Sequence, residues 1–399
     1  MDKLIYFDNN ATTKAAPEVV EAMMPYFSDE YANPSSMYSF AKKAALAVKE
    51  ARGQIKDFLN AASENEIFFT SSGSESANMA IRGVLNSNRN KRHIITSKVE
   101  HPCVLNLYQQ LEKEGYKVDL IGVNAKGELD LAELKEKISF DTAIVSIMYA
   151  NNETGVIFPV KEISEIIKSK NPETKFFADA VQAAGKIPVD VQSSGVDLLS
   201  VSGHKFHAPK GIGVLYVNPR TLITPLVIGG HQERGKRAGT ENVPYIAGIG
   251  KAAQLAVDNL KYEAEEVKRL RDKLEANILK NTFNSRLNTG ITNRVPNTTN
   301  IGFEYIEGEL ILLHLSDLGI CASSGSACTS GSLEPSHVLR AMNVPFTSIH
   351  GSIRFSLSKY NTEKEVDYVI DKMPGIIEKL TGISPYQDEL EALRKLKGN

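Results

Sequence analysis

The sequence contains few cysteines, little net charge and no long apolar run. Three cysteines among 399 residues (Cys103, Cys321 and Cys328) are too few, and odd in number, for a disulfide framework, which indicates free thiols in a reducing compartment. The 46 basic and 48 acidic side chains leave a net charge of −2, which excludes an electrostatic footprint for nucleic acid. The most apolar stretch, residues 143–150, is far shorter than the roughly 20 residues of a membrane span. The N-terminus lacks a secretory signal pattern, so we expect a cytoplasmic protein without nucleic-acid or membrane partners.

Length and composition are otherwise those of an ordinary globular protein. At about 150 residues per domain, the chain has room for two or three domains. Hydrophobic residues at 42% and charged residues at 24% are close to globular averages. A chain of this size buries enough surface to form a core without disulfides or a structural metal.

The first half of the chain predicts an α/β fold. Short β-rich runs occur at 66–70, 92–97, 116–122, 143–150, 175–180, 196–201 and 213–218. Helical stretches lie between the early ones, at 75–87, 102–115 and 160–169. This alternation predicts a mostly parallel sheet covered by helices on both faces, with ligands at the carboxyl ends of its strands. The last two runs lack a helix-sized gap, so the sheet is expected to be mixed there.

The second half of the chain predicts a smaller α+β domain. A long charged amphipathic helix is expected from residue 243 to about 280. Strands at 299–304 and 351–357 and helices at 307–318 and 362–380 follow. We therefore expect a large domain, a connecting helix and a smaller C-terminal domain.

The segment SVSGHKFHAPKGIG (200–213) follows a predicted strand and contains Lys205. A solvated lysine is the ordinary reading of such a position. The functional alternative is a Schiff-base lysine whose pKa is lowered by partial burial, so that its neutral amine attacks an aldehyde. Ser202 and His204 would then be placed to bind a phosphate.

Asp179 lies at the end of an apolar strand, in FFADAVQAAGK (176–186), and Gln182 lies just beyond it. A carboxylate on an apolar strand needs a partner. Capping of the next helix is one explanation. The other is a pyridinium nitrogen, which an opposing carboxylate keeps protonated.

The segment TSSGSESANMA (70–80) runs from a strand into a helix, where Gly73 and Ser74 could bind a phosphate at the helix N-terminus. Simple N-capping by Ser72 or Ser74 explains the same residues. The segment matches neither the dinucleotide-binding nor the P-loop glycine pattern.

Two further positions could carry chemistry. His101 follows a strand in KVEHPCVL; it is either a core or helix-start residue, or an imidazole that stacks on a planar ring and shuttles protons. Cys328 lies in the Ser/Gly-rich stretch 320–339, which predicts a loop before a helix that starts near Pro335. The spacing of CASSGSAC does not match that of zinc ligands.

Together these motifs resemble the pyridoxal-phosphate cysteine desulfurases. The resemblance extends from FDNNATT at residue 7, through NPSS (33–36), ANNETG (150–155) and RAGTEN (237–242), to IRFSLSKYNTEKEVDYV (353–369). It covers essentially the whole chain, and the order of the motifs is much more specific than any one of them. The stretch 320–342 is especially similar to the nitrogenase-associated NifS branch, which shares this short-loop form with the IscS branch.

The resemblance implies a fold-type I enzyme with pyridoxal 5'-phosphate as cofactor. Lys205 would hold the cofactor, Asp179 would face its ring nitrogen, Gln182 its ring hydroxyl, and His101 would stack on the ring. The residues implied for the phosphate are Gly73, Ser74, Ser202, His204 and, from the neighbouring subunit of a homodimer, Thr240. It also implies a large domain over residues 14–258, and a small domain over 1–13 and 259–399 that carries a mobile loop at about 322–333.

The reaction implied is conversion of L-cysteine to L-alanine. Asn152 and Arg354 would hold the substrate near the ring, since the forked guanidinium of arginine can bind both carboxylate oxygens. Cys328 would accept the sulfur as a persulfide, with His101 as the candidate that activates its thiol. The implied partner is a NifU-like iron–sulfur scaffold, and the implied purpose is nitrogenase maturation. No catalytic metal is implied, although Cys328 could contact a transferred iron–sulfur cluster.

The chain departs from the family pattern at the phosphate loop, where TSSGS has Ser72 in place of a glycine and Ser74 in place of a threonine. Ser72 must therefore avoid a positive φ or accept strain. Ala32, Tyr38 and Ala41 also replace the usual Gly, His and Gly. Two rival functions stay open. One is a related aminotransferase or selenocysteine lyase; the other is a catalytically silent sulfur relay on the same fold.

Overall fold

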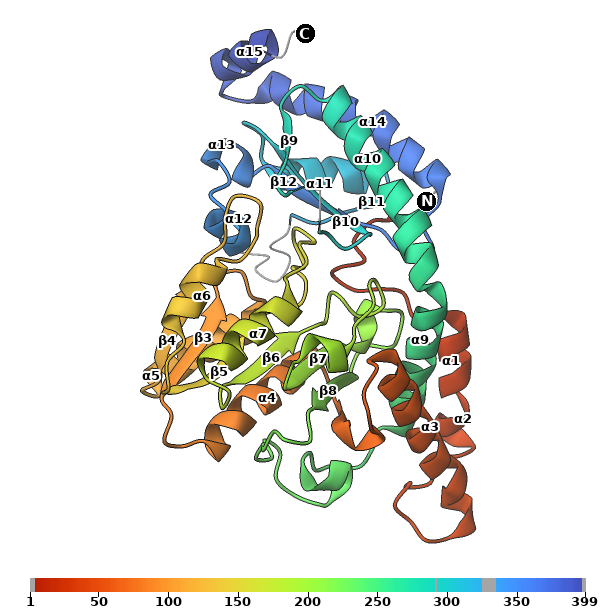
Figure 1. Ribbon diagram of the computed structural model, residues 1–399. Coiled ribbons are helices and arrows are strands. Elements are labelled where there is room, and N and C mark those ends of the chain that lie inside the picture. Colours follow the sequence, from red (N-terminus) through yellow and green to blue (C-terminus); the bar gives the residue numbers. More distant parts are fainter. Residues whose placement is uncertain (1–3, 291–292, 325–334, 397–399) are drawn as a thin grey trace.

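The computed structural model describes residues 4–290, 293–324 and 335–396 (Figure 1). Its largest sheet has seven strands in the order β2-β8-β7-β6-β5-β3-β4. The strands are β2 (Ile67–Thr70), β3 (His93–Ser97), β4 (Lys117–Ile121), β5 (Thr142–Ser146), β6 (Lys175–Asp179), β7 (Leu198–Ser202) and β8 (Gly213–Val217). All seven runs predicted from the sequence are strands, which confirms the α/β class.

The sheet is mixed at one end. Strands β4, β3, β5, β6 and β7 pair in parallel, whereas β8 is antiparallel to both β7 and β2. The short connection between β7 and β8 causes this reversal, because a parallel crossover requires a dozen or more residues. The prediction of a mixed sheet at this end is confirmed.

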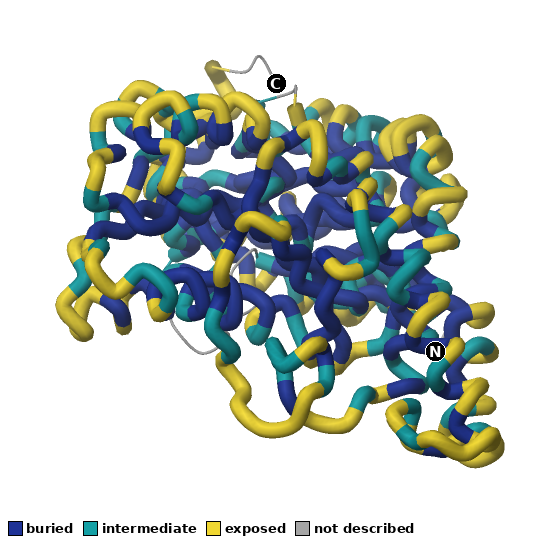
Figure 2. Tube along the Cα trace, turned by 60° about the horizontal axis from the view of Figure 1, so that its bottom comes forward, coloured by how far each residue is buried: buried dark blue, intermediate teal, exposed yellow. Residues whose placement is uncertain are grey.

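Each central strand contributes to two hydrophobic cores, because successive side chains project to opposite faces of a sheet. Leu198 and Ile94 belong to one core, and their neighbours Leu199 and Ile95 belong to the other. The first of these cores includes α4 (Gly73–Ser87) and α5 (Pro102–Lys113), and the second includes α3 (Lys42–Phe58), α7 (Val160–Lys170) and α9 (Val243–Tyr262). Both faces are therefore covered, and Figure 2 shows the buried chain in the middle of the molecule.

Several elements were absent from the sequence prediction. The N-terminal helices α1 and α3 pack along α9, on the right in Figure 1. The unpredicted α-helices are α1 (Pro17–Met23), α2 (Pro25–Ser28), α3, α6 (Leu131–Lys137), α8 (Val191–Ser194) and α13 (Phe346–Ile349). Short 3-10 turns occur at η1 (Ser39–Ala41), η2 (Glu64–Glu66), η3 (Gly203–Lys205) and η4 (Gln232–Gly235).

The helix predicted from residue 243 to about 280 contains an interruption. It consists of α9, a π-helical turn η5 (Glu263–Val267) and α10 (Lys268–Asn281), which follow one another without a loop. A π turn inserts one extra residue into the helix and is frequently found at functional sites. Here it places Glu263 in the interior, where it is 6% exposed.

The C-terminal part of the chain builds a separate three-stranded antiparallel sheet with its own core. The sheet order is β12-β10-β9, with β9 (Ser285–Leu287), β10 (Thr298–Phe303) and β12 (Ser352–Ser356). Its core includes residues of α10, α11 (Gly308–Asp317) and α14 (Glu363–Ile383). The buried residues of α12 (His337–Ala341) belong to the core of the large sheet, and α15 (Gln387–Leu396) follows α14 at the C-terminal end. The N-terminal strand β1 (Ile5–Tyr6) pairs in parallel with β11 (Ile320–Cys321), so the chain's beginning joins this part.

The division of the chain into two domains that the resemblance implies stays a prediction, because Val338 and Leu339 of the expected small domain belong to the core of the large sheet. Ile5 and Phe7 pack with residues from Val267 onward. The exact boundary at 258/259 stays a prediction, since α9 itself continues to Tyr262. Among the described residues, no helix is long and apolar enough to cross a membrane.

Candidate functional site

A cavity of about 370 Å³ lies at the carboxyl ends of the central parallel strands. Met148 follows β5, Asp179 ends β6 and Ser202 ends β7. Loops gather at this edge of a parallel sheet, where ligands of such folds usually bind. The polar residues that line it are Asn10, Ser72, Ser74, His101, Asn152, Asp179, Gln182, Ser202, His204, Lys205 and Arg354. The structure thus brings together most of the site residues expected from the sequence.

Lys205 sits in the 3-10 turn after β7 and points its ammonium group at the N-terminal segment. Its Nζ donates hydrogen bonds to the backbone oxygens of Asn10 (2.7 Å) and Ala11 (2.8 Å). These carbonyls are supplied by FDNNATT, so the segment before α1 closes one side of the cavity. Lys205 is therefore held inside the cavity and is not the solvated surface lysine of the alternative reading.

Asp179 is 6% exposed, and its position is compatible with both readings of the sequence. Its Oδ1 accepts hydrogen bonds from Val181 N (3.0 Å) and Ser200 Oγ (3.2 Å), so it does cap the turn that follows β6. It also lines the cavity. Burial raises the pKa of Asp179, and nearby His101 opposes that rise. A cation inside the cavity would offset the cost of burying this carboxylate.

The N-terminus of α4 forms another wall. Ser72 is the N-cap, with its hydroxyl accepting from Glu75 N, and its φ of −171° is extended. The departure from glycine at this position therefore causes no strain. A Cβ added to Gly73 would lie 2.9 Å from Val181 Cγ2, so the packing behind the helix start requires glycine. Gly73 and Ser74 line the cavity at the positive end of a 15-residue helix, which suits a phosphate.

Two histidines complete the cavity. His101 is the N-cap of α5, since its Nδ1 accepts from Cys103 N at 3.1 Å. This bond places the proton of the neutral ring on Nε2. Burial lowers the pKa of His101 and, together with the charge of Lys205, lowers that of His204 to about 4. Both imidazoles are therefore neutral near pH 7.

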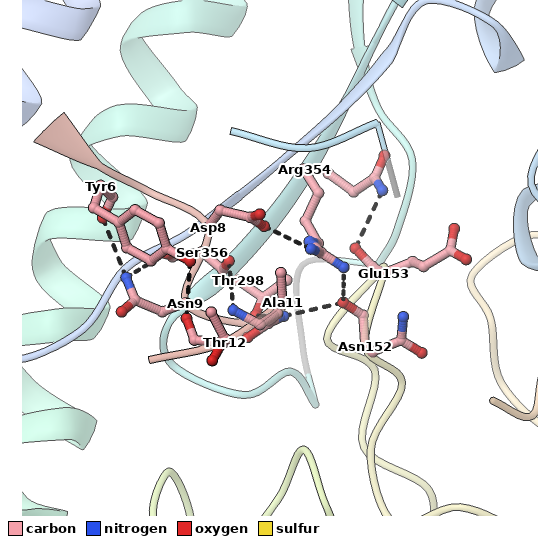
Figure 3. A network of polar contacts seen from close by, with 12 residues as sticks. Tyr6, Asp8, Asn9, Ala11, Thr12, Asn152, Glu153, Thr298, Arg354 and Ser356 are labelled. Carbon is pink, nitrogen blue, oxygen red and sulfur yellow. Dashed lines mark hydrogen bonds and ion pairs between the residues drawn. The ribbon is translucent and has the colours of Figure 1, made fainter. Parts of the chain in front are cut away.

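Arg354, on β12, reaches the cavity from the small sheet (Figure 3). The side chain is 2% exposed, and its Nη2 donates to Asp8 Oδ1 at 2.7 Å. Its Nη1 donates to the backbone oxygen of Asn152 at 3.1 Å. Asn152 also lines the cavity, so the two residues expected to hold the substrate are direct neighbours.

Three residues of the site carried no role in the sequence prediction. Asn10 accepts from Lys205 and Gln182, Asp8 pairs with Arg354, and Lys186 contacts Gln182. All three lie in motifs that the resemblance already included, FDNNATT and FFADAVQAAGK. Their roles were missed because their partners are distant in the sequence.

Two expected residues are not in this cavity. Thr240 is exposed in the loop after η4 and does not line it. Cys328 lies outside the described residues, as does most of the loop expected at about 322–333. Ser323, near the start of that expected loop, exchanges two backbone hydrogen bonds with Arg354, which connects this end to the cavity wall.

The chain matches the family model for class-V aminotransferases over residues 5–369. A cysteine desulfurase from Trichormus azollae is 56% identical over 386 residues, which are 97% of this chain and 96% of the relative. The cysteine desulfurase NifS of Azotobacter vinelandii is 50% identical over 382 residues, which are 96% and 94% of the two chains.

The chain belongs to the cysteine desulfurases of the class-V aminotransferase family.

Solved structures agree with this membership. A NifS-like protein has a TM-score of 0.89 and 40% identity, covering 95% of this chain and 100% of its own. A structure described as SspA in complex with cysteine has a TM-score of 0.78 and 35% identity, covering 90% of this chain and 100% of its own. The fold-type I prediction is thereby confirmed.

The cofactor of this family is pyridoxal 5'-phosphate, and the cavity fits it. A helix N-terminus suits the phosphate, the buried Asp179 suits a protonated ring nitrogen, and Lys205 supplies the amine. The described residues contain no cluster of three or more His, Cys, Asp or Glu side chains that could hold a metal.

Proposed function

We propose that this cysteine desulfurase converts L-cysteine to L-alanine in the cavity around Lys205 and passes the sulfur, through Cys328, to an iron–sulfur scaffold protein. The observation that carries the proposal is the convergence of Lys205, Asp179 and Arg354 on one cavity from distant parts of the chain. An amine, a buried carboxylate and a forked cation are what an amino-acid substrate and a pyridoxal cofactor require.

Bound pyridoxal phosphate would act as the electron sink for the substrate's α-carbon. Around it, Asp179 would hold a proton at the ring nitrogen, and the N-terminus of α4 would bind the phosphate. Ser202 and His204 join that phosphate site, with the neutral His204 as a hydrogen-bonding group without charge. His101 would lie over the ring and hold a proton at Nε2.

Arg354 would bind the substrate carboxylate beside Asn152. Its guanidinium is already oriented by Asp8 and by the backbone oxygen of Asn152, so little freedom is lost when substrate binds. As a neutral amine, Lys205 would then take the proton from the α-carbon, because its Nζ is held at the same cavity by two backbone carbonyls.

Cys328 would take the sulfur. Its thiolate attacks the sulfur of the substrate, an S–S bond forms, and the carbon–sulfur bond breaks with its electron pair staying on carbon. Protonation of that carbon completes alanine, and the enzyme keeps the persulfide. Such delivery requires the loop of Cys328 to reach both the cavity and a partner's surface.

The partner and assembly proposals extend this account. We assign the sulfur to a NifU-like scaffold serving nitrogenase maturation, supported by the 50% identity to NifS. A homodimer would bring Thr240 to the neighbouring subunit's phosphate site; its loop is preceded by the exposed apolar side chains of Leu226 and Ile228. The free thiols Cys103 and Cys321 favour a cytoplasmic location.

The function is tested by incubating the cofactor-loaded protein with L-cysteine, with and without a reducing thiol. Alanine and sulfide should appear in equal amounts when the thiol is present, and Lys205→Ala should yield neither. An aminotransferase would instead form a keto acid without sulfide. A silent sulfur relay would form no alanine.

A further inference from the structure

A second lysine, Lys186, lies behind the cavity wall, in contact with Gln182, and has no role in the account so far. It lies in the turn after β6, four residues beyond Gln182, and is 5% exposed. Its Nζ donates hydrogen bonds to Gln182 Oε1 and, at 3.1 Å, to Asn10 Oδ1. A fully buried ammonium is uncommon unless it is paired or has a function.

The contacts of Lys186 determine which way the Gln182 amide points. An ammonium group has only donors, so the amide oxygen must face Lys186. On the other side, Gln182 Nε2 donates to the backbone oxygen of Asn10 at 3.0 Å, and a carbonyl can only accept. Turning the amide over would place N–H against ammonium and oxygen against oxygen. The chemistry of these partners therefore fixes the amide in one orientation.

In this orientation Gln182 presents a hydrogen-bond donor to the cavity. One hydrogen on Nε2 is used by Asn10, which leaves the second as a donor for a group in the cavity that Gln182 lines. The same Asn10 oxygen accepts from Lys205 Nζ at 2.7 Å. One backbone oxygen thus couples the side chain that faces the ring hydroxyl to the lysine that holds the cofactor.

Resting on the proposed function, we infer that Lys186 is a positioning residue: it locks the Gln182 amide so that an N–H, and not the carbonyl, faces the cofactor's ring oxygen. A donated hydrogen bond stabilises the deprotonated form of that oxygen. Lys186 therefore tunes the protonation of the cofactor without touching it.

The pKa of Lys186 depends on burial and on the charged side chains around it. Burial lowers the pKa of Lys186 to about 7; Lys205 and Arg354 lower it too, whereas Glu263 raises it. Glu263 comes from the π turn between α9 and α10, and burial raises its pKa to about 7 against the opposing charges of Lys186 and Lys359. The neutral amine of Lys186 can accept as well as donate, so the orienting contact argued above belongs to the ammonium form.

The test is a double-mutant cycle read by the cofactor's visible absorption. The pH midpoint of the visible band is titrated in the loaded wild type, Lys186→Met, Gln182→Met and the double variant. Lys186→Met should raise the midpoint by about one pH unit, a tenfold change in the proton equilibrium. The double variant should show no more than the Gln182→Met shift, because Lys186 acts through Gln182.

Additivity would contradict the inference, because a purely electrostatic effect of the Lys186 charge would persist without Gln182. An unchanged midpoint in Lys186→Met would also overturn it. If the Met variant does not fold, Lys186→Gln replaces it: a glutamine can donate and accept, so it no longer fixes the amide, and an unchanged midpoint again refutes the inference. Lys168→Met, which removes a lysine that pairs with Asp197 outside the cavity, is the matched control.

Failure of the proposed function gives a different result. If the wild type binds the cofactor and shows the band but forms no alanine from L-cysteine, the function is wrong and the titration still decides the role of Lys186. If the band is normal and alanine forms, but the cycle is additive, only the inference about Lys186 falls.

Discussion

Replacing Asp179 by Asn should separate stability from catalysis. Asparagine keeps an oxygen that can accept from Val181 N and Ser200 Oγ, so the turn after β6 should stay intact. The substitution removes only the charge. Because Asp179 is 6% exposed, an effective dielectric constant near 20 is appropriate. At that value, the attraction between the Asp179 carboxylate and a protonated ring nitrogen about 4 Å away amounts to about 4 kcal/mol.

Losing this interaction should lower the rate constant for alanine formation by about a thousandfold, since each ~1.4 kcal/mol corresponds to a factor of ten. Single-turnover assays at saturating L-cysteine measure it directly. A rate within about threefold of wild type would refute the assignment of Asp179 to the ring nitrogen, because so small a change corresponds to less than 1 kcal/mol.

The same substitution, Asp179→Asn, should make the cofactor-free protein more stable although it lowers the rate. Burial raises the folded-state pKa of Asp179 above its ordinary 3.8, so the folded state binds the proton more tightly than the unfolded state does. The wild type's free energy of unfolding therefore falls as pH rises through the window above 3.8. Asp179→Asn should lose this dependence and be more stable than wild type at pH 8, in urea unfolding at several pH values.

The matched control is Asp197→Asn, directly before β7 and not among the residues that line the cavity. Asp197 Oδ2 accepts from Lys168 Nζ (2.7 Å) and Phe176 N (2.8 Å). Removing its charge should lower the free energy of unfolding and leave alanine formation unchanged. Loss of activity in this control would show that neutralising a buried carboxylate on this sheet is itself enough to disturb the site.

Borohydride reduction should fix the cofactor on Lys205, and peptide mapping that finds it on Lys186 would exchange the roles of the two lysines. Arg354→Lys should raise the KM for L-cysteine roughly thirtyfold, because a charged hydrogen bond to the substrate is lost, and should change kcat little. Steady-state kinetics measure both quantities. An unchanged KM would exclude Arg354 as the ligand of the substrate carboxylate. Burial raises the pKa of the Cys103 and Cys321 thiols. Iodoacetamide at pH 8 should therefore leave Cys103 unmodified in the folded protein, and rapid labelling found by peptide mass spectrometry would contradict the raised pKa of its thiol.

The parallel core of the fold was predictable because its strands are continuous apolar runs separated by amphipathic helices. Ile94 and Ile95 of β3, for example, are both buried, on opposite faces. Helices such as α3 were missed because much of its surface is charged and its identity as a helix depends on packing against α9. The π turn at Glu263 was equally hidden, since it does not alter the overall helical pattern.

Within the site, the sequence indicated residues that lie next to strand ends, such as Asp179 and Lys205. It did not indicate that a residue can have two roles at once: His101 caps α5 and also lines the cavity. Contacts between distant segments were also invisible, such as Asp8 with Arg354, 346 positions apart. No local pattern carries such a pairing, because only the folded chain brings the two side chains together.

The most direct test of the account is the mass of the Cys328 peptide after the loaded enzyme reacts with L-cysteine in the absence of reducing thiol. The account predicts one added sulfur on Cys328 and one alanine released for each persulfide formed. Cys328→Ser should still bind L-cysteine through Arg354 but carry no added sulfur. A persulfide on Cys321 or Cys103 instead, or continued sulfur transfer by Cys328→Ser, would contradict the account.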